Sequence, residues 1–198
     1  MVMRMLKYSV LIVISLIWIY VLSVLKRAKT DTFYFLVGSA GLFVLLLLWS
    51  KPYGVWLFST IVTGAVGLVG SLTGLFETFG MAHVIQVISH QQTHIMVVDY
   101  ECSGIIETAA FWGLIAFYPV YTIKRRIILA IAGAVCLFAA NVIRLSVVAI
   151  TVYFFGDSSF YLAHAIIGRL VFYTIAILWY YFVFTKGQLV NNVLSERR

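Results

Sequence analysis

Long apolar runs separated by short polar segments dominate this sequence. Six of the runs are each long enough to cross a bilayer as a helix, which takes roughly 20 residues. They cover residues 8–25, 32–50, 54–76, 103–122, 127–154 and 165–185. The pattern predicts an all-α integral membrane protein with six transmembrane helices in a single polytopic domain over residues 1–198. The fifth run is overlong, and we expect it to tilt or to be shortened at one end.

The only long connection between apolar runs covers residues 77–102, before the fourth run. Its segments VIQVIS and THIMVVDY alternate loosely between apolar and polar positions, which predicts a short β-hairpin. The run before it carries glycines at Gly64, Gly67, Gly70 and Gly74. Small residues at such spacings let helix backbones approach closely, so we expect these glycines to serve helix packing.

Composition supports a chain that lies almost wholly in the membrane. Hydrophobic residues make up 63% of it and charged residues only 11%, against about 25% charged residues in a soluble domain. There is therefore no room for a separate soluble domain. The net charge of +7 comes mostly from residues at the ends of apolar runs, as membrane topology requires, and does not indicate nucleic-acid binding.

The basic residues predict that both termini face the cytoplasm, because lysine and arginine concentrate on that side of a membrane. With the N-terminus inside, the inward-facing basic residues are Arg4, Lys7, Lys51, Lys124, Arg125, Arg126, Lys186, Arg197 and Arg198. Only Lys26, Arg27 and Lys29 then face outward, and the sequence gives no physical account of them. This arrangement predicts a multi-pass cell-membrane protein whose long loop, and any site beside it, is extracytoplasmic.

Cys102 begins the fourth run, next to Asp99 and Glu101. In the first turn of a helix, unpaired N–H groups and the helix dipole lower the pKa of a thiol. We expect Ser103 to cap this helix. An incidental interfacial cysteine is the alternative interpretation. Cys136 lies within an apolar run and is most simply a small buried hydrophobe.

Arg144 lies inside the fifth run, where an arginine costs about 2.5–3.5 kcal/mol at a helix centre and needs a partner or a wet cavity. Glu107, five residues past Cys102, could be that partner. Asn141 is three residues before Arg144 and shares its helical face. A purely structural Glu107–Arg144 pair is the alternative to a role in chemistry.

His164 opens the sixth run at the same outer level as Cys102, and Arg169 adds a second intramembrane guanidinium. A thiol, a guanidinium and an imidazole on consecutive spans form the parts of a cysteine acyl-transfer site. The thiolate would attack a carbonyl, the imidazole would carry the proton, and the guanidinium would steady the oxyanion or the thiolate. His90 and His94 are spaced like metal ligands, but no third ligand is evident. We therefore predict no metal and no cofactor.

Three motifs resemble those of the exosortase/archaeosortase family: ECSGI at Cys102, NVIRL at Arg144 and AHAIIG at His164. The resemblance covers about residues 75–185 and implies a multi-spanning cysteine transpeptidase with Cys102 as nucleophile. Arg144 and His164 would complete the triad, with Ser103, Glu107, Asn141 and Arg169 in support. The histidine resembles the bacterial form of the family, and the small size resembles its short Gram-positive type, exosortase G.

The same resemblance implies the partners. The substrates would be exported proteins that end in a short motif, a transmembrane helix and basic residues. Water, or an amine on a lipid or envelope precursor, would release the acyl group. Three other interpretations remain open from the residues: a small transporter that uses Arg144, Arg169 and Glu107, a thiol-redox protein, and a non-catalytic assembly factor. A transporter would favour repeated halves, and a redox protein a second cysteine within reach; neither is evident in the sequence.

Overall fold

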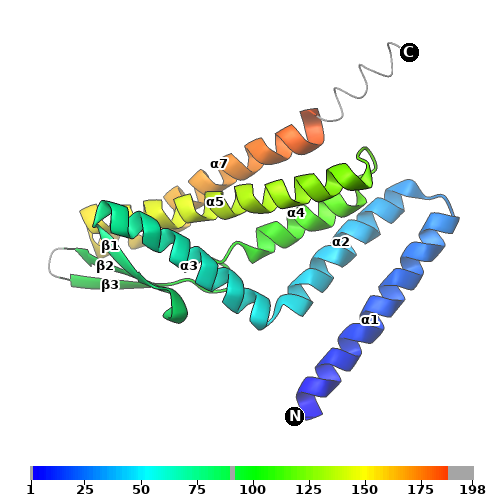
Figure 1. Ribbon diagram of the computed structural model, residues 1–198, viewed down its shortest axis with the longest axis horizontal. Coiled ribbons are helices and arrows are strands. Elements are labelled where there is room, and N and C mark those ends of the chain that lie inside the picture. The colour runs from blue at the N-terminus through cyan, green and yellow to red at the C-terminus, as the bar shows by residue number, and fades with distance from the viewer. Residues whose placement is uncertain (1, 90–91, 187–198) are drawn as a thin grey trace.

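The computed structural model describes residues 2–89 and 92–186 as a helical bundle with a small sheet (Figure 1). The main helices are α1 (Val2–Arg27), α2 (Asp31–Ser50), α3 (Tyr53–Thr73), α4 (Ile105–Phe117), α5 (Ile123–Phe155), α6 (Phe160–Leu162) and α7 (Gly168–Tyr180). Short π-helical segments, Ala163–Ile167 and Tyr181–Lys186, make α6 and α7 parts of one helical stretch, Phe160–Lys186. The strands are β1 (Phe76–Phe79), β2 (Val84–Ser89) and β3 (Gln92–Val97), and 3-10 turns cover Gly80–Ala82 and Asp157–Ser159.

The prediction of a helical membrane protein is confirmed. Five described helices are long and apolar enough to cross a membrane: Tyr8–Arg27, Asp31–Ser50, Tyr53–Thr73, Ile123–Phe155 and Phe160–Lys186. The fourth predicted run, 103–122, forms a helix of only 13 residues, α4, which is about 20 Å long. Gly104, in a left-handed conformation with φ +78°, precedes this helix. Pro119 disfavours helical geometry at Tyr118, where it ends.

Several predicted boundaries are wrong. The third run was expected to stay helical to Phe76, but α3 ends at Thr73. Gly74 adopts φ +69° there and donates its N–H to Gly70 O, a common way for a helix to stop. The fifth helix begins at Ile123, before the predicted 127, and the last helical stretch begins at Phe160, before the predicted 165.

The predicted hairpin is present and is extended by a strand that the sequence did not suggest. The sheet is antiparallel in the order β1-β2-β3. Its alternation places Ile85, Val87 and Met96 in the core beside α3 and α5, whereas Ile95 and Val97 on the other face are exposed. The sheet is held to α5 by Ser89, whose hydroxyl donates to Tyr153 O at 2.7 Å.

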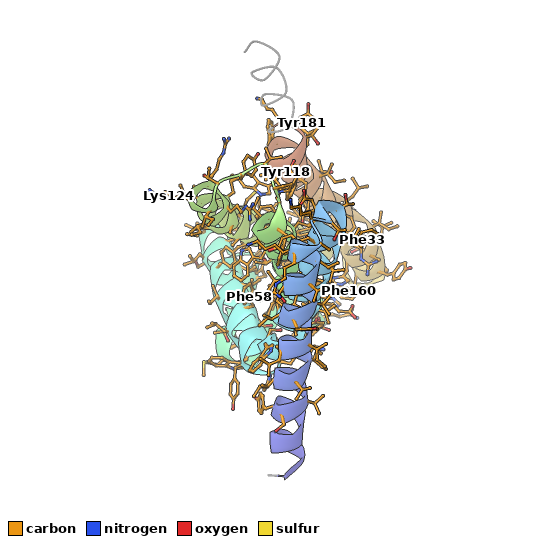
Figure 2. The ribbon with its side chains drawn as sticks, turned by 90° about the vertical axis from the view of Figure 1, so that its right-hand side faces the viewer. Phe33, Phe58, Tyr118, Lys124, Phe160 and Tyr181 are labelled. Atoms are coloured by element: carbon orange, nitrogen blue, oxygen red, sulfur yellow. The ribbon has the colours of Figure 1, made fainter. Side chains whose placement is uncertain are left out.

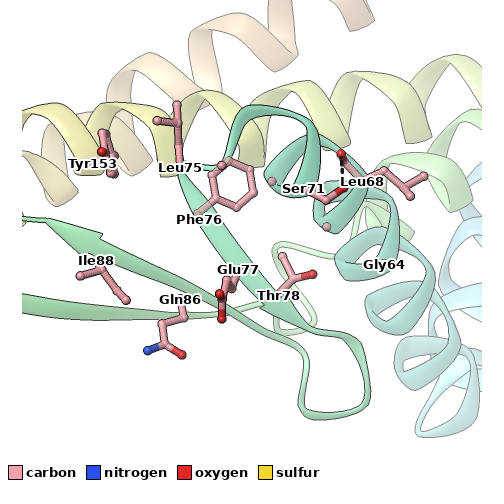
Figure 3. Close-up of a pocket in the computed structure, with 13 residues that line it drawn as sticks. Gly64, Leu68, Ser71, Leu75, Phe76, Glu77, Thr78, Gln86, Ile88 and Tyr153 are labelled. Carbon is pink, nitrogen blue, oxygen red and sulfur yellow. Dashed lines mark hydrogen bonds between the residues drawn. The ribbon is translucent and has the colours of Figure 1, made fainter.

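Two of the four predicted packing glycines, Gly67 and Gly70, pack against this added strand, whereas a Cβ at Gly64 or Gly74 would meet no atom within 4 Å. A Cβ at Gly67 would collide with Thr78 Oγ1, and one at Gly70 would lie 2.5 Å from Phe76 O. Figure 3 shows Phe76 and Thr78 pointing toward α3. The close approach predicted for these glycines therefore joins a helix to a strand. The cavity of about 690 Å³ between α3 and the sheet has none of the predicted catalytic residues in its lining.

Aromatic contacts fix which loops share an end of the bundle. The rings of Tyr34, near the start of α2, and Phe117, at the end of α4, lie 5.5 Å apart. At the other end of α2, Lys51 Nζ lies 4.1 Å from the Tyr100 ring. Tyr118 OH donates to Phe184 O at 2.8 Å, near the end of the last helix. The α1–α2 loop, the α4–α5 loop and the end of the last helix therefore meet at one end, at the right of Figure 1. Figure 2 shows Tyr118, Lys124 and Tyr181 together in its upper part.

This grouping corrects the predicted topology. Lys26, Arg27 and Lys29 were expected opposite Lys124, Arg125 and Arg126, but they share an end with them and with Lys186. The physical reason is that α2 packs antiparallel to α4, while α3 does not fold back along α2. From the level of Tyr100, α3 continues beside the second half of α5.

The sequence predicted both termini on the cytoplasmic side, whereas α1 begins and the last helix ends at opposite ends of the described bundle. The Tyr8 and Trp49 rings lie 6.2 Å apart, so α1 begins at the Lys51 end, opposite Lys186. Arg4 and Lys7 thus lie at the same end as Lys51, which is the end with fewer basic residues. Lys26, Arg27 and Lys29 lie at the end with more basic residues and are no longer an exception to the charge pattern.

We predict that single cysteines at positions 29 and 124 react from the same side of the membrane. A cysteine at position 51 should react from the opposite side, because Lys51 lies beside Tyr100. The variants Lys29→Cys, Lys124→Cys and Lys51→Cys, in a Cys102→Ala, Cys136→Ala background, would be treated with an impermeant maleimide before and after lysis of spheroplasts. Opposite reactivity of positions 29 and 124 would contradict this fold.

Candidate active site

A tight turn before α4 presents Cys102. Asp99 Oδ1 accepts hydrogen bonds from the N–H groups of Glu101 and Cys102, each at 3.1 Å. Ser103 Oγ donates to Tyr100 O at 3.0 Å and accepts from the N–H of Ile105, the first residue of α4, at 3.4 Å. Ser103 therefore contacts the helix start, but the N-cap position that was predicted for it is occupied by Gly104. Cys102, however, precedes α4 and is not in its first turn.

A buried hydrogen bond ties this turn to α5. Asn141 is fully buried, and its Nδ2 donates to Cys102 O at 2.8 Å. A Cβ on Gly104 would lie 3.2 Å from Asn141 Nδ2, so glycine permits both the positive φ and the close approach. The sequence placed Asn141 on the face of Arg144, and the structure shows what it does there: it holds the backbone of Cys102.

His164 lies directly beside the thiol. Its Nε2 is 3.8 Å from Cys102 Sγ. It lies in the π-helical segment Ala163–Ile167, a local widening that is frequent at functional sites. Its ring stacks on Phe160, with centroids 5.6 Å apart and an interplanar angle of 15°. The prediction that His164 opens the last helix is wrong by about one turn, because the helix begins at Phe160.

One cavity of about 300 Å³ collects the predicted residues. Cys102, Glu107, Arg144, His164 and Arg169 all line it, together with Tyr100, Glu101, Ile106, Phe172 and Tyr173. Arg144 is only 6% exposed. Among the described residues it forms no ion pair with Glu107, and Arg144 Nε and Glu107 Oε2 have no hydrogen-bond partner. The predicted Glu107–Arg144 pair is therefore absent, and both side chains face the shared cavity.

The thiol is protonated at rest. The pKa of Cys102 is raised to about 11, chiefly by burial and also by the carboxylates of Asp99 and Glu101, while the Arg144 guanidinium acts to lower it. The prediction of a lowered thiol pKa is wrong, because Cys102 precedes the helix and its side chain is buried. Attack by sulfur then requires a proton acceptor at the moment of reaction, and His164 Nε2 is in place for that.

The other described histidines and Cys136 lie elsewhere. His83 Nε2 is 2.8 Å from Thr60 Oγ1, and neither His83, His94 nor Cys136 lines the cavity. His90 lies outside the described residues, within which no group of histidine, cysteine and acidic side chains could hold a metal ion. The sequence reasoning missed the roles of Asp99, Gly104 and Phe160. The Asp99 spacing, two and three residues before the bonded N–H groups, is the usual Asx-turn signal.

Comparison with known proteins decides the family. The family described as transmembrane exosortase matches residues 2–181. This chain belongs to the transmembrane exosortase family. The resemblance inferred from the three motifs is thus confirmed over nearly the whole chain. The exosortase family is broadly one of membrane cysteine transpeptidases. Searches of curated proteins and of solved structures each gave no match.

We predict that alkylation of Cys102 accelerates about tenfold per pH unit from about pH 7 to 9, without the plateau near pH 8.5 of an ordinary thiol. The reason is that the thiolate fraction keeps rising toward a pKa of about 11. Iodoacetamide labelling of the purified Cys136→Ala protein, followed by mass spectrometry, measures this rate. Arg144→Gln should slow labelling at every pH, because losing the guanidinium raises the thiol pKa. Arg169→Gln is the matched control. A plateau near pH 8.5, or equal rates in the two variants, would contradict this assignment.

We also predict that Gly104→Ala destabilises the nucleophile turn by about 1–2 kcal/mol, the cost of a left-handed conformation for a residue with a Cβ. The added methyl would also press on Asn141. Gly64→Ala is the control, since its Cβ would meet no atom within 4 Å. Thermal unfolding in detergent should show a lower melting temperature for Gly104→Ala only; equal stability of the two variants would count against the strained turn.

Proposed function

We propose that this protein is a membrane cysteine peptidase or transpeptidase that cleaves the C-terminal sorting signals of exported proteins through a thioester on Cys102. The observation that carries the proposal is the 3.8 Å contact between Cys102 Sγ and His164 Nε2, beside the buried guanidinium of Arg144. Membership of the exosortase family supports the reaction class.

The proposed reaction has two half-steps. As sulfur attacks the scissile carbonyl, the thiol proton passes to His164 Nε2, and Arg144 stabilises the oxyanion. The C–N bond then breaks, the leaving amine takes the proton from His164, and the thioester remains on Cys102. In the second half-step water, or an amine on a lipid or envelope precursor, attacks the thioester. His164 takes the proton of this acceptor and returns it to the sulfur.

We place this active site at the extracytoplasmic surface. Both a distance along α5 and the distribution of basic residues support this placement. From Ile123, at the basic end, to Asn141, at the level of Cys102, α5 rises about 27 Å. A bilayer's hydrocarbon core is about 30 Å thick. With the basic end in the cytoplasm, Cys102 lies one membrane thickness away, where an exported substrate would present its cleavage site.

We predict that Cys102→Ala and Cys102→Ser abolish processing and that His164→Ala strongly reduces it, because one variant lacks the nucleophile and the other the proton acceptor. Cys136→Ala should process normally, since Cys136 lies outside the cavity. Mass spectrometry of host membrane proteins, scored for retained C-terminal segments, gives the readout. Complete processing by Cys102→Ala would refute the proposed function.

A further inference from the structure

A second cavity leads away from the candidate active site along α4 and α7. It has a volume of about 620 Å³ and shares Ile106, Glu107, Phe172 and Tyr173 with the cavity around Cys102. Its lining on the last helical stretch extends to Thr185, about 20 Å beyond Phe172 at 1.5 Å per residue. It therefore runs from the level of the nucleophile toward the basic end of the bundle.

The surface of this groove suits a helix. Its lining is almost entirely apolar and includes the small residues Ala110 of α4 and Ala176 of α7. Small side chains let helix backbones approach closely within a membrane. Ile177 is 67% exposed and Tyr181 48% exposed, so no described helix covers this side of α7.

We propose that this groove binds the transmembrane helix of the protein that Cys102 attacks, with the N-terminal end of that helix at the active-site cavity. The proposal rests on the proposed function, since it names where that substrate lies. The groove adjoins the cavity around Cys102, since four residues line both. The chain preceding the bound helix therefore enters this cavity and brings a backbone carbonyl to Cys102.

Charge favours a helix over a lipid chain as the occupant. Glu107 lies where the two cavities join, and its Oε2 has no hydrogen-bond partner. The N-terminus of a helix carries unpaired N–H donors and a partial positive charge. A carboxylate at this junction satisfies those donors and fixes the helix with its N-terminus toward Cys102. An acyl chain has no donor to offer it.

The first test fills the groove. Ala176→Trp should block processing and cause the same full-length proteins to accumulate as in Cys102→Ala, while iodoacetamide still alkylates Cys102 at the wild-type rate. The matched control is Ala134→Trp, which places the same side chain in a separate apolar cavity on α5 and should process normally. Normal processing by Ala176→Trp, when Cys102→Ala accumulates substrate, would overturn the groove alone. No accumulation in Cys102→Ala would overturn both the groove and the proposed function.

The second test identifies the occupant. Benzoylphenylalanine replaces Ala176 in the Cys102→Ala protein, and membranes are irradiated. The expected adduct joins this position to a protein that independently accumulates unprocessed in Cys102→Ala cells. Adding Glu107→Gln should lower the yield of that adduct. Adducts with phospholipid alone would contradict a helix as the occupant. A yield unchanged by Glu107→Gln would contradict the helix orientation argued from Glu107.

Discussion

One buried hydrogen bond, from Asn141 Nδ2 to Cys102 O, determines where Cys102 lies. A buried amide that loses its partner costs about 1–3 kcal/mol, so the turn is held to α5 at this depth. Gly104 makes the contact possible, because any side chain there would press on Asn141. Arg144, one helical turn beyond Asn141 on the same face, then faces the same cavity as the thiol.

Arg144 and Glu107, two charged groups of the cavity, do not neutralise one another. Arg144 and Glu107 both line it without an ion pair between them. Unpaired ionisable groups at such depth are costly and are usual only where a pathway or a site requires them. The protonated thiol fits this view. Burial keeps it uncharged at rest, and the nearby guanidinium favours the thiolate only when a proton acceptor draws the proton away.

The sequence allowed good predictions where local physics dominates. Hydropathy located the apolar helices, and the motifs located the residues that now line one cavity, although their catalytic roles remain a prediction. The shortness of α4 and the early end of α3 depend on single glycines with positive φ, at Gly104 and Gly74. The presence of a glycine in the sequence does not by itself show that its φ is positive. The thiol pKa was misjudged because sequence cannot show burial.

The grouping of the basic loops was misjudged for a different reason. Alternation of sides assumes that each apolar run crosses fully and returns, but the packing of α2 on α4 brings Lys51 to the level of Tyr100. The next helix, α3, then continues past that level beside α5 to the sheet. With 33 residues, α5 is long enough to pack against α4 and also to reach the sheet. Its first half packs against α4, between the basic end and the level of Cys102. Its second half holds the sheet through Tyr153 O. Asn141 and Arg144 lie near the junction of these halves, so the length of α5 fixes the depth of the active site.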